Sequence, residues 1–219
     1  MNYIEQYRRK INTGKLPANE DIKAAYDLIH RNIKDKVYRL DEDKASKAIE
    51  FFERFCHHVK GMWAPERIRL ELWQKAMISA IYGIVDAEGA RWYREVLICL
   101  GRKNGKTLIV SGSAELEAFT GEYGGEIYFT APKLAQANLG YDGFYQMLRF
   151  EPDLLKRVKR RRSDIYYADR STTVAPLAFN ANTSDGFNIS LGICDELAAW
   201  PATQGKKFYE VLKSSMGSR

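Results

Sequence analysis

Cysteine, histidine and long apolar runs are scarce in this sequence of 219 residues. Its three cysteines, Cys56, Cys99 and Cys194, lie far apart and form no CxxC pair, so the sequence predicts neither a disulfide scaffold nor a cysteine-based metal site. We expect all three thiols to be reduced and to lie among core residues. His57 and His58 have no Cys, Asp or Glu at ligand spacing, so we assign them no metal.

No apolar run approaches the ~20 residues of a membrane span. The charged N-terminus, MNYIEQYRRK, also lacks the uninterrupted apolar segment of a signal peptide. We therefore expect a cytoplasmic protein that does not bind a membrane. Hydrophobic residues make up 45% of the chain and aromatic residues 12%, which is enough for a buried core and excludes wholesale disorder. The net charge of +6 permits nucleic-acid binding without establishing it.

The chain is predicted to consist of a helical N-terminal segment and an alternating α/β region. Over residues 1–60 apolar residues recur at helical spacing, and the turn-rich stretch 12–21 separates two helices. Residues 60–67 are the predicted linker. Beyond it, helical patterns alternate with apolar stretches of strand length. Strands are predicted at 94–101, 125–131, 164–169, 172–179 and 187–197. This alternation favours a mostly parallel sheet that binds ligands at the carboxyl ends of its strands.

A glycine-containing turn follows the first of these strands. The segment Gly101–Thr107, GRKNGKT, ends like the Walker A pattern GxxxxGK(S/T), although Leu100 occupies the position of the first glycine. Glycine lets backbone N–H groups turn toward a phosphate, Lys106 can reach the β- and γ-phosphates, and the hydroxyl of Thr107 can ligate Mg²⁺. A helix that begins near Gly105 adds the positive end of its dipole. A bare GK(S/T) also occurs by chance, so its context decides its value.

An apolar strand that ends in two carboxylates provides this context. The stretch ISLGICDE ends at Asp195 and Glu196, which is the arrangement of a Walker B strand. In that arrangement Asp195 holds Mg²⁺ through water and Glu196 polarises the attacking water. The structural alternative is an acidic N-cap of the next helix. Together, the two features predict a nucleotide-binding domain that takes ATP and Mg²⁺.

The loop residues also resemble a known family, the large terminase subunit of tailed bacteriophages, which is the ATPase of the DNA-packaging motor. In that family the leading glycine is absent and an arginine precedes the GK(S/T) by three positions, as Arg102 does here. Residues 58–83 resemble the segment ahead of the loop, with Gln74 as the adenine-side residue. Leu72 replaces a proline that the family often has there. Residues 128–137 and 184–200 resemble two further family motifs, so the resemblance extends over about residues 50–219.

The resemblance implies a RecA-like P-loop ATPase fold over residues 61–219, with a mostly parallel sheet flanked by helices and the helical segment 1–60 before it. It implies ATP-driven translocation of double-stranded DNA into a capsid by a homo-oligomeric ring on a portal. The small terminase subunit is a further implied partner, and the cytoplasm of an infected bacterial host, or of one carrying a prophage, is the implied location. The family's nuclease domain and coupling motif are not found up to Arg219, so we expect a C-terminally truncated domain with an incomplete sheet.

The motifs and the resemblance together assign the site residues. Glu196 and Arg102 are the predicted catalytic residues, and Thr107 and Asp195 the predicted metal ligands. The predicted nucleotide-binding residues are Gln74, Gly101, Arg102, Lys103, Asn104, Gly105, Lys106 and Thr107. Trp73 is expected in a core, and Thr130 is either structural or close to the phosphates.

Several questions stay open at the level of sequence. The stretch 156–162, KRVKRRR, places six cations in seven residues, as either a solvated loop or a contact for DNA phosphates or an acidic partner. A ring ATPase also needs an arginine supplied by its neighbour. Candidates for that role are Arg161, Arg162, Arg170 and Arg219. Two further functions remain open: a superfamily 2 helicase-like ATPase, and a nucleotide-binding or assembly fragment without turnover.

Overall fold

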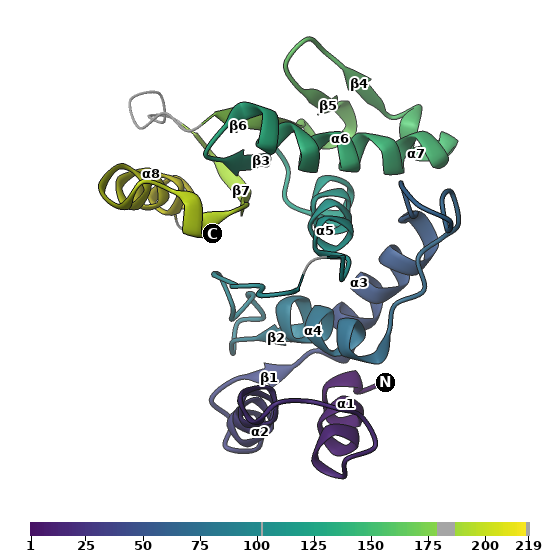
Figure 1. Cartoon of the computed structure of the whole chain (residues 1–219), viewed down its shortest axis with the longest axis vertical. Coiled ribbons are helices and arrows are strands. Elements are labelled where there is room, and N and C mark those ends of the chain that lie inside the picture. The colour runs from purple at the N-terminus through teal and green to yellow at the C-terminus, as the bar shows by residue number, and fades with distance from the viewer. Residues whose placement is uncertain (102, 179–186, 218–219) are drawn as a thin grey trace. The chain divides into compact units, whose positions relative to one another are not determined.

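The computed structural model describes residues 1–101, 103–178 and 187–217. The chain divides into two compact units, and Figure 1 shows the elements of each. The first unit comprises Met1–Arg54 and Arg67–Cys99, and the second comprises Phe55–Glu66 and Leu100–Arg219. The functional division into residues 1–60 and 61–219 stays a prediction. Within the described ranges, no helix is both long and apolar enough to span a membrane.

The first unit is mainly helical. Its helices are α1 (Tyr3–Asn12), α2 (Glu20–Lys34), all but the last residue of α3 (Glu42–Phe55), and α4 (Leu72–Gly83). Asn2 and Asn19 cap α1 and α2, because each side chain accepts a backbone N–H three residues later at 2.9 Å. The predicted break between the first two helices is thereby confirmed. Two short strands, β1 (Arg39–Leu40) and β2 (Ile84–Val85), pair antiparallel.

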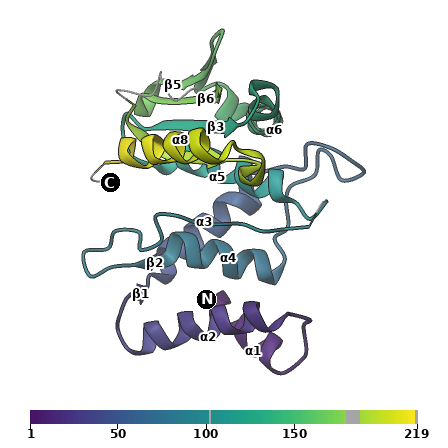
Figure 2. The same ribbon diagram turned by 60° about the vertical axis from the view of Figure 1, so that its left-hand side comes forward.

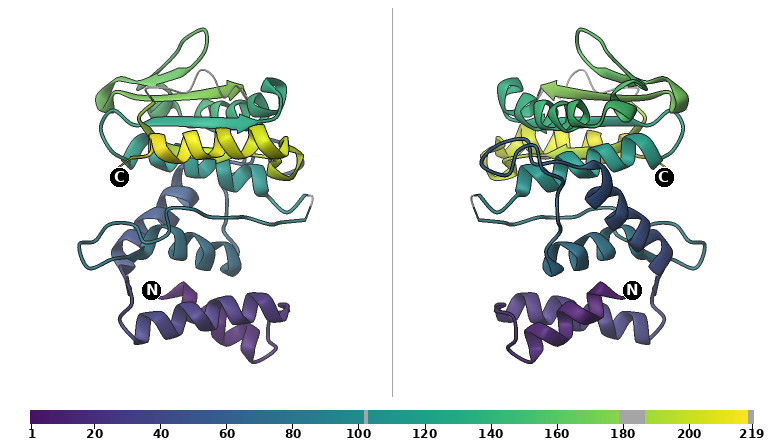
Figure 3. Two further views of the ribbon diagram at one scale, coloured as in Figure 1. Left: turned by 90° about the vertical axis from the view of Figure 1, so that its left-hand side faces the viewer. Right: turned by 90° about the vertical axis from the view of Figure 1, so that its right-hand side faces the viewer.

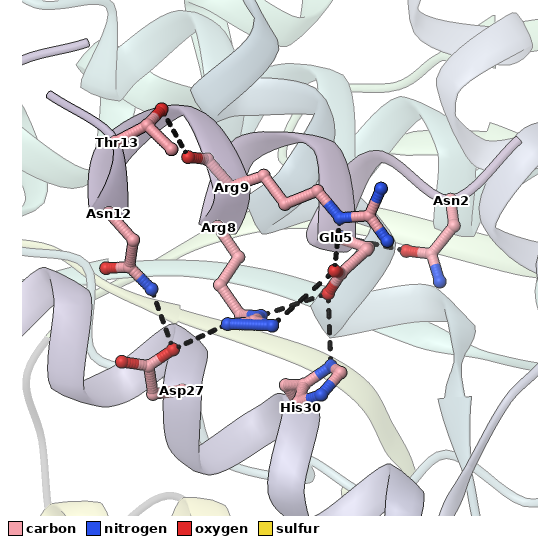
Figure 4. A network of polar contacts seen from close by, with 8 residues as sticks. All are labelled: Asn2, Glu5, Arg8, Arg9, Asn12, Thr13, Asp27 and His30. Atoms are coloured by element: carbon pink, nitrogen blue, oxygen red, sulfur yellow. Dashed lines mark hydrogen bonds and ion pairs between the residues drawn. The ribbon is translucent and has the colours of Figure 1, made fainter. Parts of the chain in front are cut away.

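Apolar and polar contacts both join α1 to α2, which lie side by side (Figure 2). The buried side chains of α1 are Ile4, Tyr7 and Ile11, spaced so that they share one helical face. At the edge of this face, Arg8 donates to both Glu5 and Asp27 at 3.0 Å, and His30 contacts Glu5 at 3.0 Å (Figure 4). The network joins the two helices at their solvent-facing margin.

The second unit is an α/β layer structure built on a five-stranded sheet in the order β4-β5-β6-β3-β7. Its strands are β3 (Glu126–Ala131), β4 (Val158–Arg160), β5 (Ile165–Tyr167), β6 (Thr172–Ala178) and β7 (Ile189–Cys194). Strands β6, β3 and β7 are parallel, whereas β4 and β5 form an antiparallel hairpin beside β6. The predicted α/β class with helices around a largely parallel central sheet is therefore confirmed.

Helices cover both faces of this sheet, as Figure 3 shows for α6 and α8. They are α5 (Lys106–Thr120), α6 (Leu134–Phe150), the short α7 (Pro152–Leu155) and α8 (Ala202–Ser215), with 3-10 turns at Ala168–Arg170 and Leu197–Ala199. Phe129 of β3 packs with Phe144 of α6 in the larger core cluster. On the opposite face, Phe208 of α8 packs with Ile189 of β7. Successive residues of a strand point to opposite faces, which explains how one sheet serves two cores.

The predicted strand at residues 94–101 is wrong. No described strand pairs with these residues, and β7 ends the sheet with β3 as its neighbour. An apolar stretch becomes a strand only where a neighbour supplies hydrogen-bond partners, so this stretch stays irregular and Leu97 is 77% exposed. Cys99 is exposed too, which corrects the expectation of a core position, whereas Cys56 is buried. The sheet is open, as expected.

Candidate functional site

The predicted phosphate loop leads directly into α5. Lys103 and Gly105 both have left-handed backbone conformations, with φ values of 64° and 80°. Gly105 is the N-cap of α5, a position in which glycine meets no steric penalty from a Cβ atom. Because Gly105 has no side chain with which to cap the helix, the first amides of α5 are directed at the loop without a competing acceptor from that residue. This is the local geometry that binds an anion.

The remaining loop residues are exposed to solvent where the structure describes them. A Cβ atom added at Gly101 would lie 3.0 Å from Nδ2 of Asn104, so the loop folds back on itself at this point. Lys103 and Asn104 are exposed, and Thr107 is exposed in the first turn of α5. Arg102, the predicted catalytic arginine, lies outside the described residues, and its role stays a prediction.

Lys106 and Asp195, distant in sequence, are brought together at this loop. Nζ of Lys106 lies 2.7 Å from Oδ1 of Asp195, and each side chain is 42% exposed. Asp195 follows β7, and its N–H donates to the carbonyl of Thr130 at the end of β3 at 2.8 Å. Its own carbonyl accepts the indole N–H of Trp200 at 3.0 Å. The acid is thus positioned by the sheet, and the lysine reaches it from the start of α5.

Glu196 occupies a strained position next to this ion pair. Its φ of 51° is unusual for a residue other than glycine and costs about 1 kcal/mol or more. Its N–H donates to Oδ1 of Asp195 at 2.9 Å. The carboxylate is exposed and its Oε2 accepts a hydrogen bond from Nε2 of Gln136 at 2.5 Å. Neighbouring acids of one turn are therefore held in different ways, one by Lys106 and the other by Gln136.

Gln136 is a candidate site residue that the sequence analysis missed. It lies in the first turn of α6, shortly after β3 ends, within a stretch that the family resemblance had marked without assigning it a role. Close packing fixes α6 at this place. A Cβ atom at Gly140 would lie 2.6 Å from the Phe129 ring, and the hydroxyl of Ser111 on α5 donates to the Gly140 carbonyl at 3.2 Å. The helix that carries Gln136 is therefore packed against both β3 and α5.

The donor set at the loop fits Mg²⁺ bound together with a nucleotide. Among the described residues, no group of three or more His, Cys, Asp and Glu side chains could hold a metal ion by itself. Protein-bound Mg²⁺ commonly takes one or two carboxylates, with substrate phosphates and waters completing its octahedron. A carboxylate such as that of Asp195 and a hydroxyl such as that of Thr107 are oxygen donors of the kind that such a set takes from a protein.

Three other residues that the sequence analysis singled out make structural contacts. Gln74 accepts the backbone N–H of Glu71 at 2.8 Å through its side-chain oxygen and so helps to cap α4. It lies in the first unit, whereas the phosphate loop lies in the second. Trp73 packs in the core of the first unit, as expected. The buried Thr130 hydroxyl donates to the carbonyl of Ile193 at 3.0 Å, which ties β3 to β7.

A buried polar cluster contacts α5 through Glu115. The Cys56 thiol donates to Oε2 of Glu115 at 3.2 Å, and His57 contacts Glu151 at 2.7 Å and the Pro65 carbonyl at 2.6 Å. Burial raises the pKa of Glu115 to about 8 and also raises that of Cys56. The Glu115 carboxyl is therefore protonated at neutral pH. Both ring nitrogens of His57 thus have a partner within hydrogen-bond distance.

Comparison with known proteins agrees with this architecture. The family described as "Terminase large subunit, ATPase domain" matches residues 72–219. The crystal structure of the HK97 bacteriophage large terminase superimposes with a TM-score of 0.65 at 22% sequence identity, covering 80% of this chain and 36% of that one. This chain thus corresponds to about a third of that protein. No curated protein is significantly similar in sequence. Since the family match covers well over half of the chain, this protein belongs to the terminase large subunit family and carries its ATPase domain.

Proposed function

We propose that this protein binds Mg-ATP at the Gly101–Thr107 loop and hydrolyses it to drive double-stranded DNA into a bacteriophage capsid. The observation that carries the proposal is the 2.7 Å contact between Lys106 and Asp195, which lies at an uncapped helix N-terminus and beside a second carboxylate. Nucleotide sites of P-loop ATPases need these groups together: backbone amides, a lysine, a hydroxyl and two acids.

The ion pair between Lys106 and Asp195 is weak enough for a phosphate to displace Asp195 from the lysine. An ion pair exposed to this degree contributes about 0–1 kcal/mol, because solvent screens it and two side chains must be ordered. Phosphate oxygens carry more charge and accept several hydrogen bonds at once, so they compete effectively for the lysine. We infer that Lys106 turns to the β- and γ-phosphates when nucleotide binds, which frees Asp195 for the metal.

Each of the other site residues has a separate role in the proposed reaction. The amides of Lys103–Lys106 and the start of α5 hold phosphate oxygens, while Thr107 and Asp195 hold Mg²⁺. A bound metal would supply neutralisation of phosphate charge. Glu196 accepts a hydrogen bond from the attacking water and polarises it toward phosphorus. Arg102 stabilises the charge that develops in the transition state, and Gln74 contacts adenine.

The family supplies the setting of this reaction. We propose that the chain acts in a homo-oligomeric ring on the portal, with the small terminase subunit as a partner and DNA as the translocated substrate. It would work in the cytoplasm of an infected bacterium or of one that carries a prophage. An arginine from the neighbouring subunit completes the site, and Arg161, Arg162, Arg170 and Arg219 remain candidates; Arg219 lies outside the described residues.

Calorimetric titration of Mg-ATPγS into the wild-type chain and into Lys106→Ala tests the phosphate site. We expect saturable binding by the wild type and its loss in the variant. Thr120→Ala, at the far end of α5, is the matched control and should bind like the wild type, since its hydroxyl only contacts the Leu116 carbonyl. If Lys106→Ala binds as tightly as the wild type, the phosphate site is misplaced.

Nucleotide binding without turnover is a second candidate function. It is favoured by the absence of a strand at residues 94–101, because the segment that leads into the loop has no sheet partner among the described residues. Tight binding of ATP without phosphate release, at high protein concentration and with duplex DNA present, would support this alternative. Steady release that DNA stimulates would exclude it.

A further inference from the structure

The basic hairpin, residues 156–167, is the most strongly charged surface segment of the second unit, and its turn projects in Figure 1. The predicted loop at its start instead contains a strand, β4, which pairs antiparallel with β5. Residues 156–164 contain six cations and a single acid, Asp164. All six cations are exposed, so this charge faces solvent or a partner.

The hairpin distributes these cations over two faces and the turn. Arg160 pairs with Ile165 on the face that packs toward α6, and its guanidinium stacks on the ring of Tyr145 at 4.2 Å. Lys159 pairs with Tyr166 on the other face, where the Arg161 guanidinium stacks on the same tyrosine at 4.5 Å. Stacking orders a guanidinium and leaves its N–H edge available for hydrogen bonds.

Neutralisation within the hairpin is incomplete. Arg161 forms an ion pair with Asp164 at 2.5 Å, Lys156 pairs with Asp153 at 3.2 Å, and Arg157 approaches Asp169 at 3.9 Å. For Lys159 and Arg162 the structure shows no carboxylate partner among the residues that it describes. Lys159 lies on β4 and Arg162 in the turn, and both are available to contact an external anion.

The strand directions place the turn at the functional edge of the sheet. Strand β4 is antiparallel to β5, and β5 is antiparallel to β6, so β4 runs in the same direction as β6, β3 and β7. The turn after Arg160 therefore lies at the carboxyl edge of the sheet, as Asp195 does. Four strand spacings separate β4 from β7, or about 19 Å. The turn thus shares an edge with the phosphate site but not the site itself.

We propose that the basic hairpin binds the phosphate backbone of duplex DNA without reading its sequence. The inference rests on the proposed function for its choice of DNA as the polymer. Alternate residues of a strand lie about 6.7 Å apart on one face, so neighbouring cations of the hairpin can contact different phosphates of a DNA strand, which carries one charge for every ~3.4 Å of helix axis. The Arg161 guanidinium covers Tyr166 and the other ring of the hairpin, Tyr167, is buried, so the exposed chemistry is that of phosphate contact.

Charge on an edge strand also discourages pairing with other strands, but that role is satisfied by a single lysine on β4. It does not account for Arg161 and Arg162, which lie in the turn beyond the strand. An acidic polypeptide would satisfy the charge as well. DNA is favoured because its phosphates form a continuous row of charges along each strand, whereas the carboxylates of an acidic polypeptide are separated by other side chains.

The test is fluorescence anisotropy with a short labelled duplex, at salt concentrations between roughly 50 and 200 mM. The variant is Lys159→Gln/Arg161→Gln/Arg162→Gln. The control, Lys206→Gln/Lys207→Gln/Lys213→Gln on α8, removes the same charge from another surface of the same unit. We expect the hairpin variant to lose at least about tenfold in affinity and its salt slope to fall by roughly 2 to 3, with little change in the control.

Thermal unfolding verifies that each variant is folded. Arg162→Gln alone, a change in the turn, should reduce the slope by about 1 and carries the test if the triple variant does not fold. Equal losses in hairpin and control variants would overturn the proposal, because net charge alone would then explain binding. So would unchanged DNA affinity combined with lost binding of a poly-glutamate peptide, which would identify an acidic protein as the partner.

Calorimetry with Mg-ATPγS separates this inference from the proposed function. Lys159→Gln, which leaves all the candidate arginines in place, should bind nucleotide like the wild type, since β4 lies four strand spacings from β7. If nucleotide binds but the hairpin variant retains full DNA affinity and slope, only the hairpin proposal fails. If the wild type binds DNA through the hairpin but no nucleotide, only the proposed ATPase function fails.

Discussion

The charged groups of the proposed phosphate site and those of the α1–α2 network differ in how many partners they already have. In the network every described acid already has a partner: Glu5 is contacted by Arg8, Arg9 and His30, and Asp27 by Arg8 and Asn12 (Figure 4). At the phosphate site Lys106 and Asp195 form one exposed pair, and backbone amides lie beside it. The first arrangement holds two helices together, and the second can exchange partners.

A large number of polar contacts does not by itself identify a functional site. The α1–α2 network contains many hydrogen bonds, yet at the N-terminus of α1 the Asn2 side chain already accepts a backbone N–H of the first turn. At the phosphate loop the N-cap of α5 is a glycine, which has no side chain that could accept such an N–H. Changes at the site should therefore alter activity with little effect on folding, and changes in the network should do the reverse.

Glu196→Gln should have the largest effect on ATP turnover of the changes considered. If turnover does not fall, the contrast between the proposed site and the α1–α2 network is wrong. Replacing the carboxylate removes the group that we propose polarises water, so we expect ATP turnover to fall by about 10²–10⁴-fold. Mg-ATPγS affinity should stay within about threefold of the wild type, since the charge on Asp195, the proposed metal ligand, is unchanged. Phosphate release and calorimetry on the same preparation measure both. Full turnover in the variant would exclude Glu196 as the carboxylate that polarises water.

Glu115→Gln tests a third kind of polar group, one that is buried below α5. Its folded-state pKa of about 8 lies above the value of 4.5 in an unfolded chain. The folded state therefore binds more protons between these values, and stability is fully present below pH 4.5 and is lost as pH rises toward 8. We expect the variant to lose this slope, which is worth on the order of a few kcal/mol.

Denaturant unfolding at pH 5 and pH 8 measures the effect. The exposed Glu88→Gln serves as the control and should follow the wild type at both pH values. A Glu115→Gln variant with the same decline between pH 5 and pH 8 as the wild type would show that another group governs the pH dependence.

Gln136→Ala tests whether Gln136 positions the Glu196 carboxylate. The amide holds the Glu196 carboxylate at 2.5 Å, so its removal frees a strained residue to reorient. We expect turnover to fall by about tenfold, which corresponds to the loss of one hydrogen bond of about 1.4 kcal/mol, and nucleotide affinity to stay unchanged. Gln136→Glu, which repels Glu196, should produce a larger change. Identical kinetics for wild type, alanine and glutamate variants would contradict a positioning role.

Arg8→Ala should have the smallest effect, on stability alone. Arg8 bridges Glu5 and Asp27 at the partly exposed margin of α1 and α2, so its loss should cost at most about 1 kcal/mol, or 2–4 °C in Tm. Burial raises the pKa of Glu5, but hydrogen bonds from Arg8 and Arg9 outweigh it and lower the pKa overall. The bridge therefore stabilises above the unfolded pKa and is lost as pH falls through the folded one.

Thermal unfolding of Arg8→Ala at neutral and acidic pH checks this prediction. The control is Arg9→Ala, which removes a 75% exposed arginine from the same acid and should cost less. Nucleotide binding should be unchanged in both variants. A larger loss in Arg9→Ala than in Arg8→Ala would contradict the assignment of the bridge.

Much of the fold was predictable because it depends on local pattern. The helix break after Asn12 follows from turn residues and an asparagine cap, and β3 and β7 follow from short apolar runs of strand length. The stretch 94–101 has an equally apolar run, but a strand needs a neighbour that sequence pattern does not supply. Strand β4 was missed for the opposite reason, because its cations are typical of a loop and its pairing with β5 depends on register.

For this protein, sequence by itself determined the site motifs, the α/β class and the family, because glycine turns, capping residues and apolar periodicity act over a few residues. Only the tertiary structure decided which groups meet. It brought Lys106 to Asp195, gave Glu196 a partner in Gln136, turned the basic run into a hairpin at the carboxyl edge and left 94–101 without a strand partner. Those outcomes depend on strand order and packing between distant segments, which no local pattern encodes.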